Sequence, residues 1–319
     1  MCDVVALGEL LIDFTPQQPG LTGSPLFQQN PGGAPANVLA ALAALGRQTA
    51  FIGKVGSDDF GHYLESVLKA QRIDTSGLVF SKDVNTTLAF VTLSDNGERS
   101  FTFYRRPGAD MMFQVHEINY SLIDRANIFH FGSVSLTHEP VRSATHEAVS
   151  YAKKKGLLIS YDPNVRMNLW DNAEEAKEQI VRCLPYADIL KVSEEELTFL
   201  TGTDVLEDGT QQLYSLYGTP CILVTLGEQG CFYRTGEITG HVRGFRVKAV
   251  DTNGAGDAFL GGILFQVLQM SKPMNEWSRA DTESMITFGN AMGAIVASKQ
   301  GALPAMPGLS EVQRMLGNM

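Results

Sequence analysis

The sequence predicts an α/β protein in which helices cover both faces of a mainly parallel sheet. Short apolar runs with strand character alternate with longer helical stretches through most of the 319 residues. Strand, helix and strand joined in this order form right-handed βαβ units, which make neighbouring strands parallel. Glycine-rich turns follow several strands, and ligands of such folds bind where the strands end. We therefore expect one domain over residues 1–319, built in three layers, with a site at one edge of the sheet.

The composition favours a cytoplasmic protein with a large core and small-molecule ligands. Hydrophobic residues make up 44% of the chain, charged residues 19%, and the formal net charge is -10. This charge argues against a nucleic acid or an anionic membrane as partner. The cysteines form no CxxC pair, and the histidines have no ligand spacing, so we expect reduced thiols and no zinc site. No basic region opens the chain, and no apolar run approaches the length of a membrane span.

Apolar runs and glycines set the limits of the first elements. The expected strands are 4–7, 10–14 and 49–55, and the expected helices are 36–45 and 57–72. Gly46 ends the first of these helices, as glycine often does. The Pro, Gln and Gly-rich residues 15–30 predict a loop or an excursion at a sheet edge, and residues 31–35 a sharp turn.

Residues 85–104 predict a β-hairpin that stands apart from the main sheet. Two β-rich runs flank residues 95–98, and Asn96-Gly97 between such runs is a strong hairpin signal. Apolar and polar residues partly alternate in both runs, so one face should be covered. We expect residues of about 11–30 and 85–108 to form a small β-sheet lid inserted in the core.

The second half of the chain repeats the α/β pattern more regularly. The expected strands are 128–131, 157–161, 187–192 and 221–226, and the expected helices are 140–155, 173–184, 193–200, 258–270 and 281–299. Residues 235–237 predict a further hairpin turn.

The stretch 249–270 carries the clearest chemical signal. We expect it to open as the end of a strand and to continue into a helix that is apolar on nearly every face, and therefore buried. Gly254 and Gly256 leave the backbone bare where the first turn of the helix has unpaired N–H groups and a favourable dipole for an anion. This is a place to hold a phosphate, with the Asp257 carboxylate beside it to accept a hydroxyl proton. The alternative is that Asp257 is an ordinary helix cap.

Two common nucleotide motifs are missing from the sequence. There is no GxxxxGK[ST] run and no GxGxxG after the first strand. A P-loop NTPase and an ordinary dinucleotide-binding protein therefore lose their main support.

The glycine-rich motifs resemble those of the ribokinase-like (PfkB-type) carbohydrate kinases. Residues 251–257, followed by Gly261-Gly262, are similar to the C-terminal motif of this family, and residues 32–37 with downstream glycines are similar to its N-terminal motif. Within the family the likeness is greatest to fructokinases, through the runs 8–14, 103–110, 162–166 with Leu169-Trp170, and 301–307. The resemblance covers the whole chain and implies the three-layer ribokinase-like fold.

The resemblance implies a catalytic group and a set of sugar contacts. Asp257 would be the catalytic base, and the backbone of Gly254, Ala255 and Gly256 would be an anion hole for the transferring phosphoryl group. A carboxylate at a helix N-terminus is expected to be a weak base, which suffices where catalysis is mostly positioning. The implied substrate-binding residues are Asp13, Gly32, Gly33, Asn37, Arg106, Arg166 and Asp257.

Several of the sugar contacts have plainer alternatives. Asp13 could be an exposed charge on an edge strand, and Asn37 could cap the helix after Pro35. Arg105 and Arg106 would point to opposite faces of a strand, so only one should reach the ligand.

The resemblance also implies a nucleotide site and bound cations. The implied cofactor-binding residues are Asn164, Lys191, Ser193, Thr225, Gly227, Gly230, Gly254, Gly256 and Asn290, for ATP. Glu196 is expected to stand near Mg²⁺ without ligating it directly, and Asp251 with Asn253 to serve a monovalent cation, K⁺. Ser193 stands where the family often has Asn, and Ser193 with Glu196 also fits a capping box without catalysis. Residues 162–164 could likewise be a simple turn, and the Thr225 to Gly230 run an ordinary strand-to-hairpin turn.

The sequence therefore predicts an ATP-dependent sugar kinase that converts D-fructose to D-fructose 6-phosphate. One alternative within the family is a kinase for 2-keto-3-deoxygluconate or another sugar acid, whose carboxylate Arg105, Arg106 or Arg166 could bind. A nucleoside kinase is a further alternative, and a sugar- or nucleotide-binding sensor without turnover is the alternative from another class. We expect the lid to close over the sugar and exclude water, and its exposed face to form a homodimer.

Overall fold

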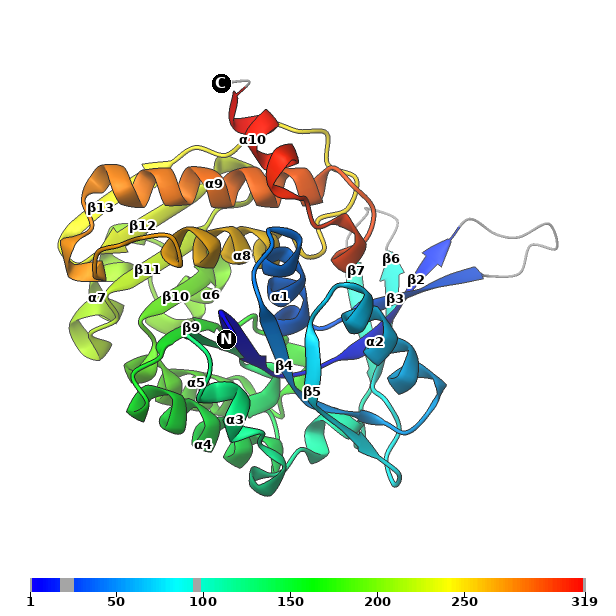
Figure 1. Ribbon diagram of the computed structural model, residues 1–319. Coiled ribbons are helices and arrows are strands. Elements are labelled where there is room, and N and C mark those ends of the chain that lie inside the picture. Colours follow the sequence, from blue (N-terminus) through cyan, green and yellow to red (C-terminus); the bar gives the residue numbers. More distant parts are fainter. Residues whose placement is uncertain (1, 18–25, 94–98, 318–319) are drawn as a thin grey trace.

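A large mixed sheet and a small second sheet organise the molecule (Figure 1). The computed structural model describes residues 2–17, 26–93 and 99–317. Within these ranges the large sheet has nine strands, in the order β13 (Ile238–Val242), β12 (Cys231–Thr235), β11 (Cys221–Thr225), β10 (Ile189–Ser193), β9 (Leu158–Asp162), β8 (Ile128–Gly132), β1 (Val4–Leu7), β4 (Thr49–Gly56) and β5 (Asp74–Ser81). Neighbouring strands from β11 to β5 are parallel, and only the pairs β11–β12 and β12–β13 are antiparallel. The predicted mainly parallel sheet is confirmed.

Helices cover both faces of this sheet and give the predicted three layers (Figure 1). One face carries α1 (Ala34–Ala44), α2 (Asp59–Ala70), α8 (Ala255–Val267), α9 (Arg279–Ala297) and α10 (Leu309–Gly317). The other carries α3 (Tyr120–Ile123), α4 (Val141–Lys154), α5 (Ala173–Cys183), α6 (Glu194–Thr201) and α7 (Leu206–Tyr217). Each face of the sheet packs against its helices in one apolar core. Strand β1 contributes to both cores because its side chains alternate between the faces: Val4 lies in the core with α1 and α8, and Val5 in the core with α4 and α5.

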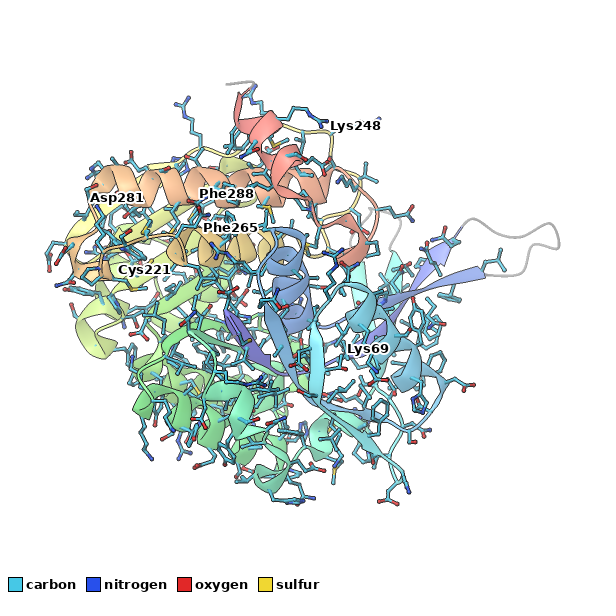
Figure 2. All side chains as sticks on the ribbon, in the orientation of Figure 1. Lys69, Cys221, Lys248, Phe265, Asp281 and Phe288 are labelled. Atoms are coloured by element: carbon cyan, nitrogen blue, oxygen red, sulfur yellow. The ribbon has the colours of Figure 1, made fainter. Side chains whose placement is uncertain are left out.

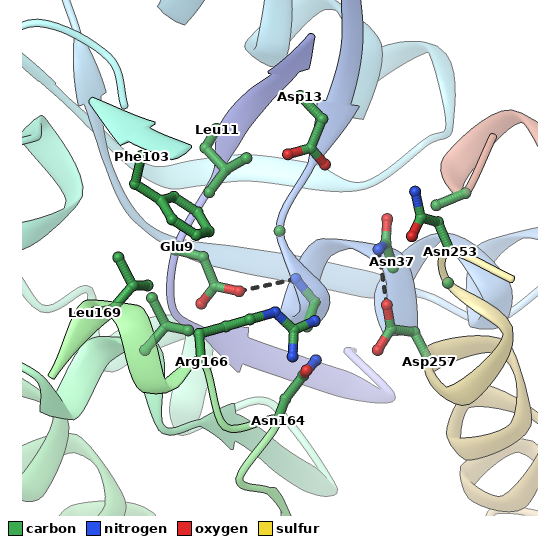
Figure 3. A pocket seen from close by; sticks show the side chains of 15 residues that line it. Glu9, Leu11, Asp13, Asn37, Phe103, Asn164, Arg166, Leu169, Asn253 and Asp257 are labelled. Carbon is green, nitrogen blue, oxygen red and sulfur yellow. Dashed lines mark hydrogen bonds between the residues drawn. The ribbon is translucent and has the colours of Figure 1, made fainter. Parts of the chain in front are cut away.

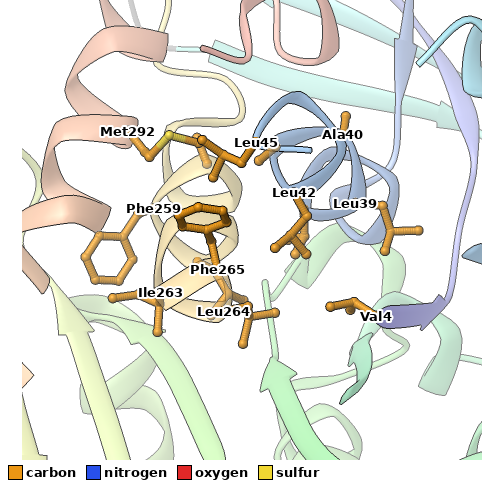
Figure 4. Close-up of a cluster of buried hydrophobic side chains, with 14 of the residues drawn as sticks. Val4, Leu39, Ala40, Leu42, Leu45, Phe259, Ile263, Leu264, Phe265 and Met292 are labelled. Atoms are coloured by element: carbon orange, nitrogen blue, oxygen red, sulfur yellow. The ribbon is translucent and has the colours of Figure 1, made fainter. Parts of the chain in front are cut away.

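Helix α8 lies in the middle of the first core, as its apolar sequence predicts. It packs between α1 and α9, and Figure 4 shows Phe259 and Ile263 on the side of α8 that faces α9 and Leu42 of α1 on its other side. Phe265 of α8 stacks on Phe288 of α9, with ring centroids 5.4 Å apart; both rings are labelled in Figure 2. A helix buried on all sides has a fixed axis, so its N-terminus is held in one place.

The small sheet is formed by the two segments that the sequence predicts as a lid. Within the described residues its order is β3 (Leu26–Gly32), β2 (Leu11–Gln17), β6 (Leu88–Leu93) and β7 (Arg99–Tyr104). The pair β2–β6 is parallel and the other two pairs are antiparallel. The predicted hairpin strands are therefore present, while its predicted turn at 95–98 lies outside the described residues. The stretch 15–30 is not simply a loop, since β2 continues to Gln17 and β3 begins at Leu26.

The small sheet has two different faces. Leu11, Asp13 and Phe103 point from β2 and β7 toward the body of the protein, where they line a cavity. The opposite face carries a row of aromatic rings: Phe90 stacks on Phe14 with centroids 4.9 Å apart and meets Phe27 and Tyr104 edge-on. This aromatic row holds the four strands together on the side away from the cavity.

Several parts of the expected element order were wrong or missing. Residues 243–253 contain no strand, so the stretch 249–270 does not open on a strand end; the N–H groups of Val250 and Asp251 instead donate to the carbonyl oxygen of Ala297. Strand β5 and helices α3, α7 and α10 were not predicted at all. None of the helices in the described ranges combines the length and apolar character needed to span a bilayer.

Candidate active site

The strand ends of the large sheet and the N-terminus of α8 meet at one edge of the molecule. Glu9 follows β1, Asp162 ends β9, Ser193 ends β10 and Thr225 ends β11. These strands are parallel, so their carboxyl ends share this edge. Helix α8 begins here too, although no strand leads into it.

The first of two cavities at this edge, cavity A, has a volume of about 90 Å³ (Figure 3). Its polar walls come from seven side chains: Glu9, Asp13, Asn37, Asn164, Arg166, Asn253 and Asp257. Leu11 and Phe103 of the small sheet supply apolar surface on the lid side. A small enclosure with many hydrogen-bonding groups and some apolar wall is suited to a compact polyol.

The second cavity, cavity B, has a volume of about 320 Å³ and is lined largely by backbone and apolar groups. Predicted nucleotide-binding residues gather on its wall: Thr225, Gly227, Gly230, Gly256 and Asn290. Of these, Asn290 is buried, and its Nδ2 donates to the carbonyl oxygens of Val242 and Arg243 at 3.2 and 3.1 Å. Asn290 therefore has a structural partner as well as a place on the cavity wall.

The N-terminus of α8 separates the two cavities. Gly254 and Asp257 line cavity A, whereas Ala255 and Gly256 line cavity B. Gly254 is the N-cap residue with φ +75°, a conformation that favours glycine, and no side chain caps the helix. A group held against the amides of residues 254–256 would be within reach of ligands in both cavities.

Asp257 faces cavity A and is held from the far end of the sequence. Asn37 Nδ2 donates to Asp257 Oδ2 at 2.7 Å, so the carboxylate does not act as the cap of its own helix. Burial raises the pKa of Asp257 to about 6, helped by the charge of Asp162 and opposed by Asn37, Lys191 and Arg166. The carboxylate is therefore a stronger base than the sequence alone suggests.

Asn37 lies inside α1 and not at its end. The N-cap residue is Gly33, and the N–H of Asn37 donates to the Gly33 carbonyl oxygen, so the alternative of Asn37 as a cap is wrong. Its Oδ1 is buried, lies on the wall of cavity A, and has no partner among the described residues. One amide thus orients Asp257 and still offers an acceptor to a ligand.

Asp13 and the glycine pair form another part of this wall. A Cβ on Gly32 would lie 2.4 Å from Asp13 Oδ2, and a Cβ on Gly33, with φ +123°, would lie 2.4 Å from the Glu9 carbonyl oxygen. Glycine is therefore needed at both positions for the chain to pass these groups. Strand β2 pairs on both sides, so Asp13 is not on an edge strand. Burial raises the pKa of Asp13 to about 7, although Arg166 opposes this rise.

The turn after β9 brings two predicted residues to cavity A. Asn164 has φ +45°, and its N–H donates to Asp162 Oδ1 at 3.2 Å, so the turn suggested by the sequence is present. Asn164 and Arg166 both line cavity A, which means that turn and ligand site coincide.

The two arginines of the lid connection do not reach cavity A. Arg105 is 5% exposed, and its guanidinium is bound by Asp110 at 2.7 Å and by Thr137 at 2.9 Å. Because Arg105 turns inward, its neighbour Arg106 is exposed and is absent from the lining of cavity A. The expected sugar contact of Arg106 stays a prediction.

A buried charge cluster lies beneath the N-terminus of α8. Lys191 Nζ forms an ion pair with Asp162 Oδ2 at 2.9 Å, and a Cβ on Gly256 would lie 3.2 Å from this Nζ. Burial lowers the pKa of Lys191, but Asp162 and Glu196 outweigh it and hold the pKa above its usual range. The ammonium group is therefore charged and stands beside the predicted phosphate position.

Ser193 and Glu196 form the capping box that the sequence allows. Ser193 Oγ accepts the N–H of Glu196 at 3.2 Å, and Glu196 Oε2 accepts the N–H of Ser193 at 2.8 Å. Glu196 Oε1 also accepts the N–H of Val165 at 2.6 Å. Burial raises the pKa of Glu196 despite the nearby Lys191. The expected place of Glu196 near Mg²⁺ stays a prediction.

Asp251 shapes the loop before α8. Its Oδ1 accepts the N–H of Asn253 at 2.9 Å, and its Oδ2 accepts the N–H of Gly301 at 3.2 Å. In the part of the chain that the structure describes, no group of three or more His, Cys, Asp or Glu side chains is arranged to hold a metal ion.

Glu9 belongs to the site, but the sequence analysis assigned it no role. It is 5% exposed, lines cavity A, and its Oε1 accepts the N–H of Ala34 at the start of α1 at 2.9 Å. A carboxylate directly after a buried parallel strand was the available signal, because such positions face the ligand edge.

Comparison with known proteins agrees with this geometry. Residues 1–308 match the pfkB family of carbohydrate kinases. Fructokinase-1 of Oryza sativa subsp. japonica is 47% identical over 315 residues, which cover 98% of this chain and 97% of that protein. A fructokinase crystal structure from Xylella fastidiosa with bound ATP has a TM-score of 0.91 and 36% identity, covering 100% of this chain and 99% of that chain. One from Vibrio cholerae O395 with fructose, ADP and calcium has a TM-score of 0.90 and 35% identity, covering 99% of both chains.

Both predicted motifs thus lie in one site, and the family match covers nearly the whole chain. This chain belongs to the pfkB family and is an ATP-dependent carbohydrate kinase.

Proposed function

We propose that this kinase acts on D-fructose and transfers the terminal phosphoryl group of ATP to its primary hydroxyl, giving fructose 6-phosphate. The observation that carries the proposal is the position of the α8 N-terminus between cavity A and cavity B. Cavity A takes the sugar and cavity B takes the nucleotide. The relatives named fructokinase support fructose as the acceptor.

In this mechanism Asp257 accepts the proton of the attacking hydroxyl, while Asn37 fixes the direction of the carboxylate. The sugar oxygen forms a bond to the terminal phosphorus as the bond to the bridging oxygen breaks, and ADP leaves. The backbone amides of Gly254, Ala255 and Gly256 face the charge that builds on the phosphoryl oxygens. The Lys191 ammonium adds a positive charge on the same side.

The charges of cavity A favour a neutral sugar over a sugar acid. Its charged lining residues are the carboxyl groups of Glu9, Asp13 and Asp257 and one guanidinium, that of Arg166. A substrate carboxylate would lie among more carboxyl groups than positively charged groups here, and it would be repelled by the negative charge. Arg105 cannot assist, because it is committed to Asp110 in a buried ion pair.

Magnesium fits the cluster below α8. Asp162 and Glu196 bring two carboxylates against the single positive charge of Lys191, which leaves the cluster acidic when both are ionised. Bound Mg²⁺ neutralises charge on the nucleotide phosphates. We place Glu196 near this ion without direct ligation, since both of its oxygens accept backbone N–H groups.

We propose K⁺ at the loop that Asp251 holds before α8, with Asp251 and Asn253 as its nearest residues. The support is that both carboxylate oxygens of Asp251 accept backbone N–H groups, which fixes this loop beside cavity A. A cation there would order the anion hole from behind.

A substrate panel tests the proposed function. ADP release is measured with fructose, glucose, ribose, adenosine and 2-keto-3-deoxygluconate side by side. We expect the highest kcat/KM with fructose; a higher value with the keto acid would contradict the choice of sugar. Absence of turnover with every acceptor would favour a binding protein without catalysis.

Asp257→Asn tests the role of the base. We expect kcat to fall by roughly 10²–10⁴-fold, because proton acceptance is lost while the shape is kept. Fructose binding, measured by calorimetry, should remain. Asp59→Asn is the matched control, since Asp59 is an exposed carboxylate in the first turn of α2. A near-normal kcat for Asp257→Asn would refute the assignment.

A further inference from the structure

One oxygen of Glu9 has no partner in an otherwise well-bonded site. Oε1 accepts the N–H of Ala34, whereas Oε2 is buried and has no hydrogen-bond partner among the described residues. The side chain lines cavity A. Figure 3 shows Glu9 beside the aliphatic part of the Arg166 side chain and Asp257 beyond its guanidinium group, so Glu9 lies away from the reacting end of the cavity.

Capping α1 does not explain both oxygens. One acceptor is enough for the Ala34 N–H, and a buried oxygen left without a hydrogen bond is destabilising. Burial raises the pKa of Glu9 to about 7; the charge of Asp110 adds to the rise and that of Arg105 opposes it. The protein therefore holds a costly group at the cavity wall, where a ligand can pair with it.

We propose that Glu9 Oε2 accepts a hydrogen bond from a hydroxyl of the bound sugar, and that this hydroxyl is not the one that is phosphorylated. The inference rests on the proposed function, in which cavity A takes the sugar. Asp257 and Asn37 lie at the end of the cavity where the attacking hydroxyl binds. Glu9 therefore contacts a hydroxyl on a different carbon of the same sugar. Glu9 is then a specificity-determining residue, and its contact should appear in the KM for the sugar more than in kcat.

Glu9→Gln separates this contact from the cap. The amide oxygen can still accept the Ala34 N–H, while the cavity-facing acceptor becomes an NH₂ donor. We expect the KM for fructose to rise about tenfold, as for the loss of one hydrogen bond to a charged group. The kcat and the KM for ATP should stay within about twofold, because the reacting end and cavity B are unchanged.

Fructose analogues identify the partner hydroxyl. 1-Deoxy-D-fructose, 3-deoxy-D-fructose, 4-deoxy-D-fructose and 2,5-anhydro-D-mannitol each lack one hydroxyl. In the wild type, the analogue without the partner hydroxyl should have a raised KM. In Glu9→Gln the same analogue should lose no further affinity, since the contact is already gone. The other analogues should lose the same factor in both enzymes.

Glu139→Gln is the matched control. Glu139 is exposed and also accepts a backbone N–H, from Ser143 at 3.2 Å, but it does not line cavity A. Its KM for fructose should equal that of the wild type. If the thermal midpoint shows that Glu9→Gln does not fold, the analogue comparison is repeated with Glu9→Asp. The carboxylate of Asp is shorter, so this variant should also lose the contact with the partner hydroxyl.

The possible results separate the two ideas. If the wild type does not phosphorylate fructose, the proposed function fails and the inference fails with it. If the wild type does so, but the variant has a normal KM for fructose or shows no coupling with any analogue, Glu9 is only a helix cap and the inference alone is overturned.

Discussion

Asp257 depends on residues that lie far from it in the sequence. Asn37, 220 positions away, donates to its carboxylate, and burial raises its pKa to about 6 from the ordinary 3.8. A carboxylate with this pKa is ionised at neutral pH and is protonated below about pH 6. It can therefore accept a proton at neutral pH, and this ability is lost as the pH falls.

Replacement of Asn37 should move the acid limb of the pH–rate profile. The hydrogen bond from Asn37 lowers the pKa of Asp257, so Asn37→Ala should raise this pKa. As the pH is lowered, kcat/KM should then begin to fall at a higher pH than in the wild type. A shift of about one pH unit is expected for the loss of such a bond. The measurement is kcat/KM for fructose from pH 5 to 9 in both enzymes.

Other carboxyl groups titrate in the same range, so a control is needed. Glu9 and Asp13 have pKa values raised to about 7 and contribute to the wild-type limb. Asn164→Ala removes another side-chain amide from cavity A, one that has no hydrogen bond to Asp257. The acid limb of the kcat/KM profile of this variant should lie at the same pH as in the wild type. Equal profiles for Asn37→Ala and the wild type would mean that Asn37 does not set the basicity of Asp257.

Sequence reasoning reached these residues unevenly. Asp13 and Asp257 were predicted because each stands in a local pattern, a carboxylate in an apolar run and one after a glycine turn. The bond between Asn37 and Asp257 was not, since it exists only once α1 and α8 pack together. Alternation along a strand predicts that Arg105 and Arg106 diverge, but it does not say which of the two turns inward.

At the scale of elements, α8 is positioned by glycines as much as by apolar side chains. A Cβ on Gly261 would lie 2.5 Å from the Cβ of Ala41, so α1 and α8 touch through their backbones here. A Cβ added to Gly262 would likewise lie 3.1 Å from the Cα of Gly289 in α9. The contact between these helices sets where the N-terminus of α8 lies, and thus where the anion hole is.

Gly261→Ala should destabilise the protein by overpacking this contact. The added methyl group would force α1 and α8 apart, which costs about 1–3 kcal/mol. Urea unfolding, followed by circular dichroism, gives the change in midpoint. Gly317→Ala is the control, because a Cβ at this end of α10 meets nothing within 4 Å. Equal midpoints for both variants would mean that α1 and α8 can separate at no cost.

Elements were predictable where their sequence pattern was uniform. Helix α8 and strands such as β1 and β11 have continuous apolar runs, and their limits agree with the structure to within a few residues. Strand β5 mixes polar and apolar residues because it is the last strand of the sheet, and α7 has a glycine within it. The segment before α8 looked like a strand, but its backbone bonds go to the end of α9.

On the scale of the whole molecule, the small sheet separates the sugar site from an aromatic surface. One face supplies Asp13 and Phe103 to cavity A. On the other face Phe27 is 44% exposed and Tyr104 is 65% exposed, next to the partly covered Phe90. Exposed aromatic rings in contact with one another are typical of protein interfaces. We therefore propose that two copies of this chain pair through this face.

Tyr104→Asp should disrupt the pairing. A charge at the centre of an aromatic interface is costly, so the variant should sediment as a monomer where the wild type sediments as a dimer. Leu216→Asp is the control, since Leu216 is a 62% exposed apolar residue of α7, which covers the other face of the large sheet. A monomeric wild type, or a dimeric Tyr104→Asp, would contradict the proposal.

The shared wall between the two cavities also limits how relatives of this enzyme can diverge. Residues 254–257 border both cavities, so a substitution there alters the fit of both ligands together. A different sugar is more readily accommodated by substitutions on the outer wall of cavity A, such as Leu11 and Phe103 of the small sheet. A different phosphoryl donor is more readily accommodated by substitutions near Phe245 in cavity B. Changes of ligand specificity are therefore expected on the outer walls of the two cavities, while the N-terminus of α8 between them stays unchanged.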